Sequence, residues 1–391
     1  MLESAAMPRV IGVVSVARSD WGHLVPVLEA MREAADLDVR LLVGGAHLSP
    51  RFGSTVTAIE AAGWPIAARV EMVGAGDAPL DMATAAGRSV TGFAEVFARQ
   101  GLDLLVVLGD RIEMLGAAVA ALPFALPVAH LHGGEVTEGA IDEQARHAIT
   151  KLAHLHFPAA EPYARRLRQM GEEPWRVHCV GAPGLDRLPR LATLSRADLA
   201  SRLGLPLRRP TVLVTFHPVT LEHADTARHV DELAAALSGV EGDLVISYPG
   251  ADTAHRAVVE RWTALAAARP GTRLAPSLGE DVYCSLLREA DAMVGNSSSG
   301  IIEAASFGLP VVNIGSRQQG RLRGENVIDV GQGRDEIAAG IARALDPAFR
   351  RGLAGMRNPY GDGAAAPRIV RILREVPLGP RLARKRFADL P

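Results

Sequence analysis

The sequence predicts an α/β protein with two doubly wound domains, and three observations support this fold class. Short apolar runs typical of buried strands alternate with longer amphipathic stretches typical of helices. This alternation starts twice, once near the amino terminus and again after residue 210. The chain has 391 residues, which is enough for two domains of roughly 100–200 residues that each bury a core.

The first half contains four apolar runs that we expect to be strands and two stretches that we expect to be helices. The expected strands are Val10–Val16, Val39–Val43, Leu104–Leu108 and Val128–Leu131. The expected helices are Leu24–Ala34 and about Glu113–Leu122. Strands that are separated by helix-length segments pair in parallel through right-handed crossovers, so we expect a parallel sheet.

The second half repeats the pattern. The expected strands are Val212–Phe216, Leu244–Ser247, Ala292–Val294 and Val311–Ile314. The expected helices are about Thr226–Leu237, Ala254–Ala268, Val282–Glu289 and Gly300–Phe307. The same argument predicts a second parallel sheet with helices on its faces.

The stretch between the two sets, Arg187–Pro210, is rich in Arg, Leu and Pro, and we place the domain boundary near residue 190. We expect domains at residues 1–190 and 191–366. Residues 367–391 would then be a C-terminal helix or tail that could pack back on the first domain. Ligands of open α/β sheets bind at the carboxyl ends of the strands, so we expect both sheets to face one cleft.

Composition and charge exclude several classes of protein. The 42 basic and 44 acidic residues leave a net charge of −2, which argues against a nucleic-acid-binding surface. The two cysteines, Cys179 and Cys284, cannot form a disulfide framework, which fits a reducing compartment. Lys151 and Lys385 are the only lysines, so the other 40 basic residues are arginines and an isolated arginine is weak evidence of function.

An acid and a guanidinium directly follow the third expected strand. Asp110 suits proton transfer, and Arg111 suits contact with a phosphate. Alternatively, Asp110 caps the next helix, and Glu113 completes a capping box. Taken alone, these residues favour capping over chemistry.

Histidines, glycines and a carboxylate follow the next strand, in the run His130-Leu131-His132-Gly133-Gly134-Glu135. The two glycines allow a ligand to approach the backbone beside Glu135. His130, His132 and Glu135 are also possible metal ligands, with both histidines on one face of a strand. Because no His-Glu-x-x-His helix accompanies them, we do not favour a metal site.

A predicted helix start follows at Gly139-Ala140-Ile141-Asp142-Glu143. Glu143, Arg146 and His147 are spaced by three and four residues, so they share one helical face and could point at one place. A solvated helix with ordinary side-chain pairs would give the same pattern.

In the second half, His217 lies at the exit of the first strand, where Pro218 follows it, and we weigh a structural and a functional role equally. A further strand ends in Gly295-Asn296-Ser297-Ser298-Ser299-Gly300, which we expect to open a helix. Helix N-termini present unpaired N–H groups and bind phosphate readily. Glu303 could accept hydrogen bonds from a ribose, and Arg317 and Arg321 could complete an anion site.

Other common nucleotide and nucleophile motifs are missing from the sequence. No glycine-rich dinucleotide fingerprint follows the first strand, and no Gly-x-x-x-x-Gly-Lys-Ser/Thr loop or Gly-x-Ser-x-Gly elbow occurs. The sequence therefore disfavours NAD, P-loop ATP and serine-nucleophile chemistry.

Taken together, these stretches resemble the hydrolysing UDP-N-acetylglucosamine 2-epimerases, which supply N-acetylmannosamine for sialic acid synthesis. The resemblance extends from about Val10 to Val330 and rests on five motifs in the same order. They are Gly109–Met114, His130–Thr137, Gly139–Leu152, Gly295–Gly300 and Arg317–Arg321.

The resemblance implies the GT-B architecture, two Rossmann-like domains facing across a cleft, with a catalytic group in the first domain. It implies anti elimination of UDP to a 2-acetamidoglucal, followed by addition of water that releases the epimerised sugar. The implied catalytic residues are Asp110, Glu135, Glu143 and His217. The implied substrate-binding residues are Arg18, Arg111, His132, Asn296, Ser297, Ser298, Glu303, Arg317 and Arg321.

The resemblance also implies a UDP-linked sugar as substrate, no cofactor, no metal, no nucleic acid and no membrane. It suggests a cytoplasmic homo-oligomer, a dimer by analogy. The reaction fits the residues, because a helix N-terminus with arginines suits a departing diphosphate and carboxylates suit proton transfer at carbon 2.

One residue departs from the family pattern: Trp21 stands where Tyr is expected in the Arg-x-Asp-Tyr-Gly version of the first loop. If this side chain lines the sugar or uracil pocket, the donor preference could change. Relatives act on UDP- or GDP-linked 2,4-diacetamido-2,4,6-trideoxy sugars of the legionaminic acid pathway, which is an alternative substrate. A non-hydrolysing epimerase, a GT-B glycosyltransferase and a sugar-nucleotide sensor are further alternatives.

Overall fold

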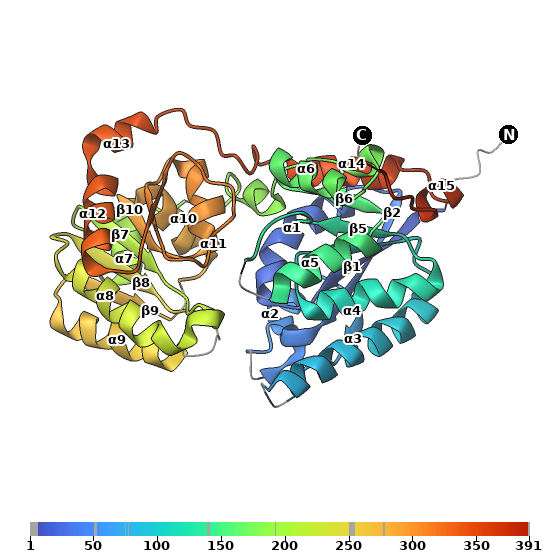
Figure 1. Ribbon diagram of the computed structural model, residues 1–391, viewed down its shortest axis with the longest axis horizontal. Coiled ribbons are helices and arrows are strands. Elements are labelled where there is room, and N and C mark those ends of the chain that lie inside the picture. Colours follow the sequence, from blue (N-terminus) through green and yellow to red (C-terminus); the bar gives the residue numbers. More distant parts are fainter. Residues whose placement is uncertain are drawn as a thin grey trace. The chain divides into compact units, whose positions relative to one another are not determined.

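The computed structural model describes residues 7–50, 53–74, 76, 78–138, 141–191, 193–249, 255–276 and 278–389 (Figure 1). The chain divides into two compact units. Unit 1 comprises Met1–Glu135, Ile141–Arg187 and Tyr360–Pro391, and unit 2 comprises Val136–Ala140 and Leu188–Pro359.

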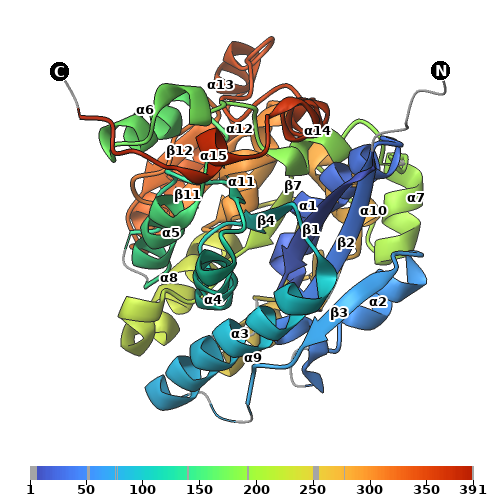
Figure 2. The same ribbon diagram turned by 90° about the vertical axis from the view of Figure 1, so that its right-hand side faces the viewer.

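Unit 1 is built on a six-stranded parallel sheet with the order β3-β2-β1-β4-β5-β6. Its strands are β1 (Arg9–Ser15), β2 (Leu37–Gly44), β3 (Ile66–Val70), β4 (Leu104–Leu108), β5 (Val128–Leu131) and β6 (Leu155–Phe157). Its helices are α1 (Arg18–Arg32), α2 (Val56–Ala61), α3 (Pro79–Gln100), α4 (Ile112–Ala121), α5 (Ile141–Leu152), α6 (Glu161–Gln169), α14 (Ala365–Glu375) and α15 (Pro380–Ala383). Helix α4 contacts α3 and α5, and α1 contacts α14 (Figure 2).

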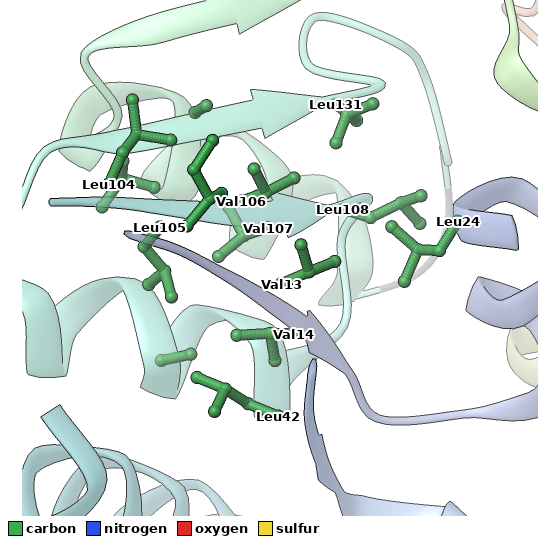
Figure 3. Close-up of a cluster of buried hydrophobic side chains, with 14 of the residues drawn as sticks. Val13, Val14, Leu24, Leu42, Leu104, Leu105, Val106, Val107, Leu108 and Leu131 are labelled. Atoms are coloured by element: carbon green, nitrogen blue, oxygen red, sulfur yellow. The ribbon is translucent and has the colours of Figure 1, made fainter. Parts of the chain in front are cut away.

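The core of unit 1 lies on both faces of its sheet. Val13 and Val14 are successive residues of β1, and both are fully buried because their side chains point to opposite faces. In Figure 3, Val14 lies beside Leu42 on one side of β1, and Val13 lies on the other side. Every residue of β4 is buried, as expected for a central strand of a sheet covered on both faces.

Unit 2 repeats this plan with the strand order β12-β11-β10-β7-β8-β9. Its strands are β7 (Thr211–Thr215), β8 (Asp243–Ser247), β9 (Thr272–Ala275), β10 (Ala292–Gly295), β11 (Val311–Ile314) and β12 (Val327–Val330). Its helices are α7 (Arg196–Leu203), α8 (Thr226–Ser238), α9 (His255–Ala268), α10 (Glu280–Glu289), α11 (Ser298–Ile302), α12 (Arg334–Leu345) and α13 (Pro347–Gly352). All of its strand pairs are parallel.

Two hydrophobic clusters cover the two faces of the second sheet. Val212 and Val214 belong to the cluster that includes Trp262, whereas the intervening Leu213 belongs to the cluster that includes Leu286. The apolar runs are therefore continuous because both faces are buried.

In each unit the strand order reverses direction at one point, and ligands of such sheets bind there. In unit 1 this point lies between the neighbours β1 and β4, and in unit 2 it lies between β7 and β10. The chain segments that leave these four strands contain most of the residues singled out from the sequence. Two doubly wound parallel sheets are thus confirmed, and their arrangement around one cleft stays a prediction.

The expected strands Leu104–Leu108, Val128–Leu131 and Val311–Ile314 are confirmed residue for residue. The first helix begins at Arg18 rather than Leu24, because its start is stabilised by Asp20 and it accommodates Pro26. The expected helix Gly300–Phe307 is instead α11 followed by a 3₁₀ turn, Ala304–Phe307. Ala254, the expected start of another helix, lies outside the described residues.

The observed division lies after Arg187 and Pro359, whereas the sequence analysis places boundaries at residues 190 and 366. Arg187 donates from Nη1 to the carbonyl of Gly22 at 3.0 Å, which holds it in unit 1. Tyr360 hydrogen-bonds the hydroxyl of Tyr163 at 2.9 Å, so the chain has already returned to unit 1 at this residue.

Within the described part of the chain, no helix has the length and apolar character needed to cross a membrane.

Candidate functional site

A network of charged side chains occupies the carboxyl ends of β4 and β5 in unit 1. The guanidinium of Arg146, buried on α5, forms an ion pair with Asp110 and donates from Nη1 to the carbonyl of His132 at 2.7 Å. The Nδ1 atom of His132 lies 2.5 Å from Oε1 of Glu135. The structure therefore joins Asp110 to Glu135 through Arg146 and His132, although these residues come from three separate segments.

The capping interpretation of Asp110 is wrong. Helix α4 has Arg111 as its N-cap residue, and no side chain caps this helix start. Glu113 instead accepts a hydrogen bond from Nη2 of Arg111 at 3.3 Å. The carboxylate of Asp110 instead faces the guanidinium of Arg146, 36 positions along the chain.

A second acidic group surrounds Arg111. Burial raises the pKa of Asp20 to about 6, although Arg111 and the backbone N–H groups of Val16 and Ala17 oppose this shift. Burial likewise raises the pKa of Asp142, with a further contribution from the nearby charge of Asp110. Burial alone would lower the pKa of Arg111, but its acidic neighbours raise it. The site therefore holds carboxyl groups in unequal environments, which is typical of acid–base sites.

His130 and His132 are two residues apart but differ in their surroundings. Both ring nitrogens of His130 have partners, the carbonyl of Gly109 at 2.8 Å and Oγ1 of Thr150 at 3.4 Å. Burial lowers the pKa of His130 to about 3, so this ring is neutral and structural.

His132 leaves the strand with φ +60°, so the expectation that it shares a strand face with His130 is wrong. An ionised carboxylate only accepts hydrogen bonds, so Nδ1 of His132 carries the proton shared with Glu135. The buried Nε2 atom has no hydrogen-bond partner among the described residues. A buried imidazole that faces a carboxylate through one ring nitrogen has the geometry of an acid–base group.

The tight turn after His132 depends on glycine. Gly134 has φ +76°, and a Cβ atom there would lie 2.6 Å from the carbonyl oxygen of Tyr163. No other residue fits without displacing this backbone, so Gly134 is what brings Glu135 back toward His132.

Other predicted residues of unit 1 lie at the same sheet edge. Glu143 and His147 on α5 are partly exposed and pair at 3.1 Å, whereas Arg146 between them points into the acid network. Gly139 and Ala140 lie outside the described residues. Arg18 is exposed at the first turn of α1. Trp21 packs edge-to-face on Trp64 with 6.3 Å between ring centroids, so its large ring has a packing partner within unit 1.

In unit 2, Asn296 connects the ends of β7 and β10. Its side-chain oxygen accepts the backbone N–H of His217 at 2.7 Å, and its side-chain nitrogen donates to the carbonyl of the same residue at 2.8 Å. The backbone carbonyl of Asn296 accepts hydrogen bonds from Arg317 at 3.0 Å and Gln318 at 2.9 Å. The side chain and the backbone carbonyl of Asn296 thus join three predicted residues, Asn296, His217 and Arg317, in one group.

The serine run opens α11 as expected. Ser297 is the N-cap residue, and its hydroxyl accepts the backbone N–H of Ser299 at 3.3 Å. Gly295, just before it, has φ +142°, and a Cβ atom there would lie 1.9 Å from the carbonyl of Thr215. Only glycine allows the strand to turn into the serine run this close to β7.

The floor under this helix start is made of hydroxyl groups. Burial raises the pKa of Tyr283 to about 12, and the hydroxyl groups of Ser299, Thr215 and Ser297 lie close enough to oppose this shift. The negative charge of Glu303 lies close enough to contribute to this shift, so Glu303 belongs to the same group. Arg321 donates from Nε to the carbonyl of Val136 at 3.2 Å within unit 2, away from Asn296.

Four residues of these two groups were missed by the sequence analysis as site residues. Arg146, Asp20, Gln318 and Tyr283 each contact a predicted residue. Spacing on α5 was the only signal for Arg146, and Asp20 follows Arg18 in the first loop. Nothing local marks Tyr283. No three His, Cys, Asp or Glu side chains are grouped for metal binding in the part of the chain that the structure describes.

The sequence of the chain is similar to those of known proteins. A family model described as UDP-N-acetylglucosamine 2-epimerase matches residues 29–374. A Legionella pneumophila protein, UDP-N,N'-diacetylbacillosamine 2-epimerase (hydrolyzing), is 37% identical over 97% of this chain and 99% of its own length. The UDP-N-acetylglucosamine 2-epimerase of Neisseria meningitidis is 29% identical over 98% and 100%.

Among solved structures, a putative UDP-N-acetylglucosamine 2-epimerase from Listeria monocytogenes is similar with a TM-score of 0.80. The match covers 94% of this chain and 96% of that chain at 18% identity, so it supports the fold.

Proposed function

Because this chain belongs to the UDP-N-acetylglucosamine 2-epimerase family, we propose that it is a hydrolysing 2-epimerase of a UDP-linked 2-acetamido sugar. The observation that carries this proposal is the buried network Asp110–Arg146–His132–Glu135 at the end of β4 and β5. A protein that only binds sugar nucleotides has no use for carboxylates held ready beside a basic imidazole.

The proposed reaction has two steps. In the first, the bond between carbon 1 and the diphosphate breaks, carbon 2 loses its proton, and the electron pair of that C–H bond forms the C1–C2 double bond. In the second, water adds its oxygen to carbon 1, and carbon 2 receives a proton on the opposite face. The products are UDP and the free sugar with inverted carbon 2.

We assign the proton transfers to unit 1. Asp110, Glu135 and Glu143 are the proposed catalytic carboxylates, and His132 extends the predicted set because its Nε2 atom offers a lone pair. Arg146 holds the carboxylate of Asp110 in place through their ion pair. Arg18 and Arg111, at the ends of β1 and β4, are proposed contacts to the substrate.

We assign diphosphate binding to unit 2. Ser297 and Ser298 open α11, and the N–H groups of a helix start attract an anion. Arg317 is held beside them through Asn296, and Arg321 and Glu303 are further proposed contacts. His217, fixed by Asn296, is proposed to donate a proton or hydrogen bond to the leaving phosphate.

Two sugars are candidates. The sequence analysis favours UDP-N-acetylglucosamine. The Legionella relative, named for UDP-N,N'-diacetylbacillosamine, is 37% identical, compared with 29% for the Neisseria relative named for UDP-N-acetylglucosamine. We therefore propose the UDP-linked diacetamido sugar as the preferred substrate and UDP-N-acetylglucosamine as the alternative.

The test is to incubate the purified protein with each donor in deuterated buffer and to analyse products by NMR. We expect UDP and a free sugar that carries deuterium at carbon 2. An intact epimerised sugar nucleotide would identify a non-hydrolysing enzyme instead. Release of UDP without deuterium at carbon 2, or only with an added acceptor, would contradict the proposal.

A further inference from the structure

The only two lysines of the chain bind the same buried carboxylate, which is not part of the acid network. The side chain of Glu172 is fully buried in unit 1. Its Oε1 atom lies 2.6 Å from Nζ of Lys151, and its Oε2 atom lies 2.7 Å from Nζ of Lys385. The Nε2 atom of His156 on β6 completes the group at 2.9 Å from Oε2.

Lys385 also closes the C-terminal end of α5. Its ammonium group donates to the carbonyls of Thr150 and Lys151 at 2.9 Å each, and to the carbonyl of Ala153 at 2.7 Å. These are among the last carbonyls of the helix, which have no partner within it. A cation at a helix C-terminus also interacts favourably with the helix dipole.

The geometry at Lys385 suits a lysine and not an arginine. Four oxygen atoms, three carbonyls and one carboxylate, lie within 2.9 Å of a single nitrogen atom. A compact ammonium can point its donors at such a converging set, whereas a planar guanidinium spreads its donors over a fork. In a chain where 40 of 42 basic residues are arginines, both exceptions lie at this carboxylate.

A second buried cation holds the segment that carries Lys385. Arg176 is fully buried and donates to the carbonyls of Leu382 at 2.9 Å and of Arg381 and Arg384 at 3.1 Å each. The backbone N–H of Ala388 donates to the carbonyl of Gly171 at 2.9 Å. We call residues 384–388 the C-terminal strap, because both of its ends are bonded to the body of unit 1.

Two paths lead from the strap to the acid network. Along the helix, α5 carries Arg146 one turn before Thr150, and Arg146 bonds Asp110 and the carbonyl of His132. Through side chains, Thr150 contacts His130, and His130 bonds the carbonyl of Gly109, the residue before Asp110. A shift of the end of α5 would therefore move Asp110 from both sides.

We propose that the C-terminal strap is a positioning device for the acid network, in which Lys385 and Glu172 fix the end of α5 and thereby the place of Asp110 and Arg146. Lys385 is a positioning residue, since it contacts neither substrate nor the reacting atoms. The proposal rests on the proposed function in that turnover is its principal readout.

The test compares Lys385→Met and Lys385→Arg with the matched control Arg386→Met, which changes the exposed neighbouring side chain. We expect kcat to fall by about 10- to 100-fold in both Lys385 variants, because a misplacement of about 1 Å costs up to about 100-fold. We expect KM and the calorimetric Kd for UDP to change less than twofold, and amides at the end of α5 to exchange faster with deuterium. Arg386→Met should behave as wild type in every assay.

Rescue separates positioning from general stability. Lys385→Cys alkylated with bromoethylamine restores an ammonium at nearly the original distance and should regain most of the lost kcat, with alkylated wild type as control. Folded Lys385 variants with unchanged kcat would overturn the proposal, as would losses in KM and UDP affinity equal to those in kcat. If wild type turns over no sugar nucleotide, the proposed function fails. In that case, deuterium exchange of the amides at the end of α5 tests the role of the strap. Unchanged exchange rates in Lys385→Met would overturn the proposal.

Discussion

Units 1 and 2 share one strand order, yet their sheet edges carry opposite kinds of chemistry. At the ends of β4 and β5, unit 1 holds ionised side chains that neutralise one another, such as Asp110 with Arg146. At the ends of β7 and β10, unit 2 holds an amide, hydroxyl groups and a helix start around Asn296 and Ser297. The fold decides where a ligand binds, and the side chains decide what happens to it.

The difference has a cost that falls on unit 1. Burying a carboxyl group raises its free energy unless charges and hydrogen bonds compensate it, and the pKa of Asp20 near 6 is a sign of incomplete compensation. The amide of Asn296 is buried at no such cost, because all of its described bonds are to backbone groups. We therefore expect substitutions in the acid network of unit 1 to act mainly on turnover and substitutions of Asn296 in unit 2 to act mainly on binding.

The largest expected effect is that of Asp110→Asn. The variant keeps the shape of the side chain but removes the charge that pairs with Arg146 and can transfer a proton. We expect kcat to fall by about 1,000-fold, since proton-transfer groups contribute about 10²–10⁴. The Kd for UDP should stay within twofold by calorimetry, and Glu95→Gln on the exposed face of α3 serves as control. A large loss of UDP affinity would break the division between the units.

The two neighbouring histidines provide a sharper comparison within unit 1. His132→Gln removes the lone pair backed by Glu135, and we expect kcat to fall by about 100-fold while the melting temperature changes little. His130→Gln disturbs bonds to Gly109 and Thr150, so we expect lower thermal stability instead. Kinetics and melting curves of both variants check this. Equal kinetic losses would contradict the assignment of His132 as the reactive ring.

A binding effect is expected from Asn296→Ala in unit 2. The change leaves the backbone N–H and carbonyl of His217 without their partners, and an unpaired buried polar group costs about 1–3 kcal/mol. We expect the Kd for UDP to rise by about 30-fold and kcat to change by less than about threefold. Asn296→Asp, which keeps the acceptor but loses the donor, should lie between wild type and Asn296→Ala. A loss confined to kcat would reverse the roles of the two units.

The smallest expected effect concerns pH and Asp20. Its pKa is about 6 in the folded chain and 3.8 in the reference state, so the folded chain binds this proton more tightly. Asp20 therefore lowers the free energy of unfolding above pH 6, and this loss disappears as the pH falls from 6 toward 4. Relative to wild type, Asp20→Asn should raise the unfolding free energy by about 2 kcal/mol more at pH 7.5 than at pH 4. Melting curves at the two pH values measure this difference. Asp335→Asn, which changes an exposed residue of α12, serves as the control.

Local pattern predicted the central strands well because their burial is complete. The run Leu104–Leu108 is apolar throughout and ends at Gly109, so both its type and its bounds follow from the sequence. The start of α1 did not follow, because the apolar pattern placed it at Leu24, and only the bonds from Val16 and Ala17 to Asp20 show that the helix begins earlier. Helix α3, with two internal glycines, was not predicted at all.

Motifs named the candidate site residues, whose roles stay predictions, but motifs did not show how these residues are connected. Asp110, His132 and Glu135 were named from motifs, and the helical spacing around Arg146 suggested a shared face without indicating which residues it would bond. For the same reason helix capping was left open as an alternative for Asp110: a short acid before a helix has the same local pattern whether it caps that helix or faces a distant guanidinium.

By itself the sequence determined where the central strands form, which strand ends carry polar side chains, and that two similar sheets arise from one chain. Those properties depend on periodicity and on burial within short windows. Only the tertiary structure decided which charges meet, as with Asp110 and Arg146 or with Lys385 and Glu172. Pairs of this kind form because chain crossovers bring distant segments together, and no local preference of either residue records its partner.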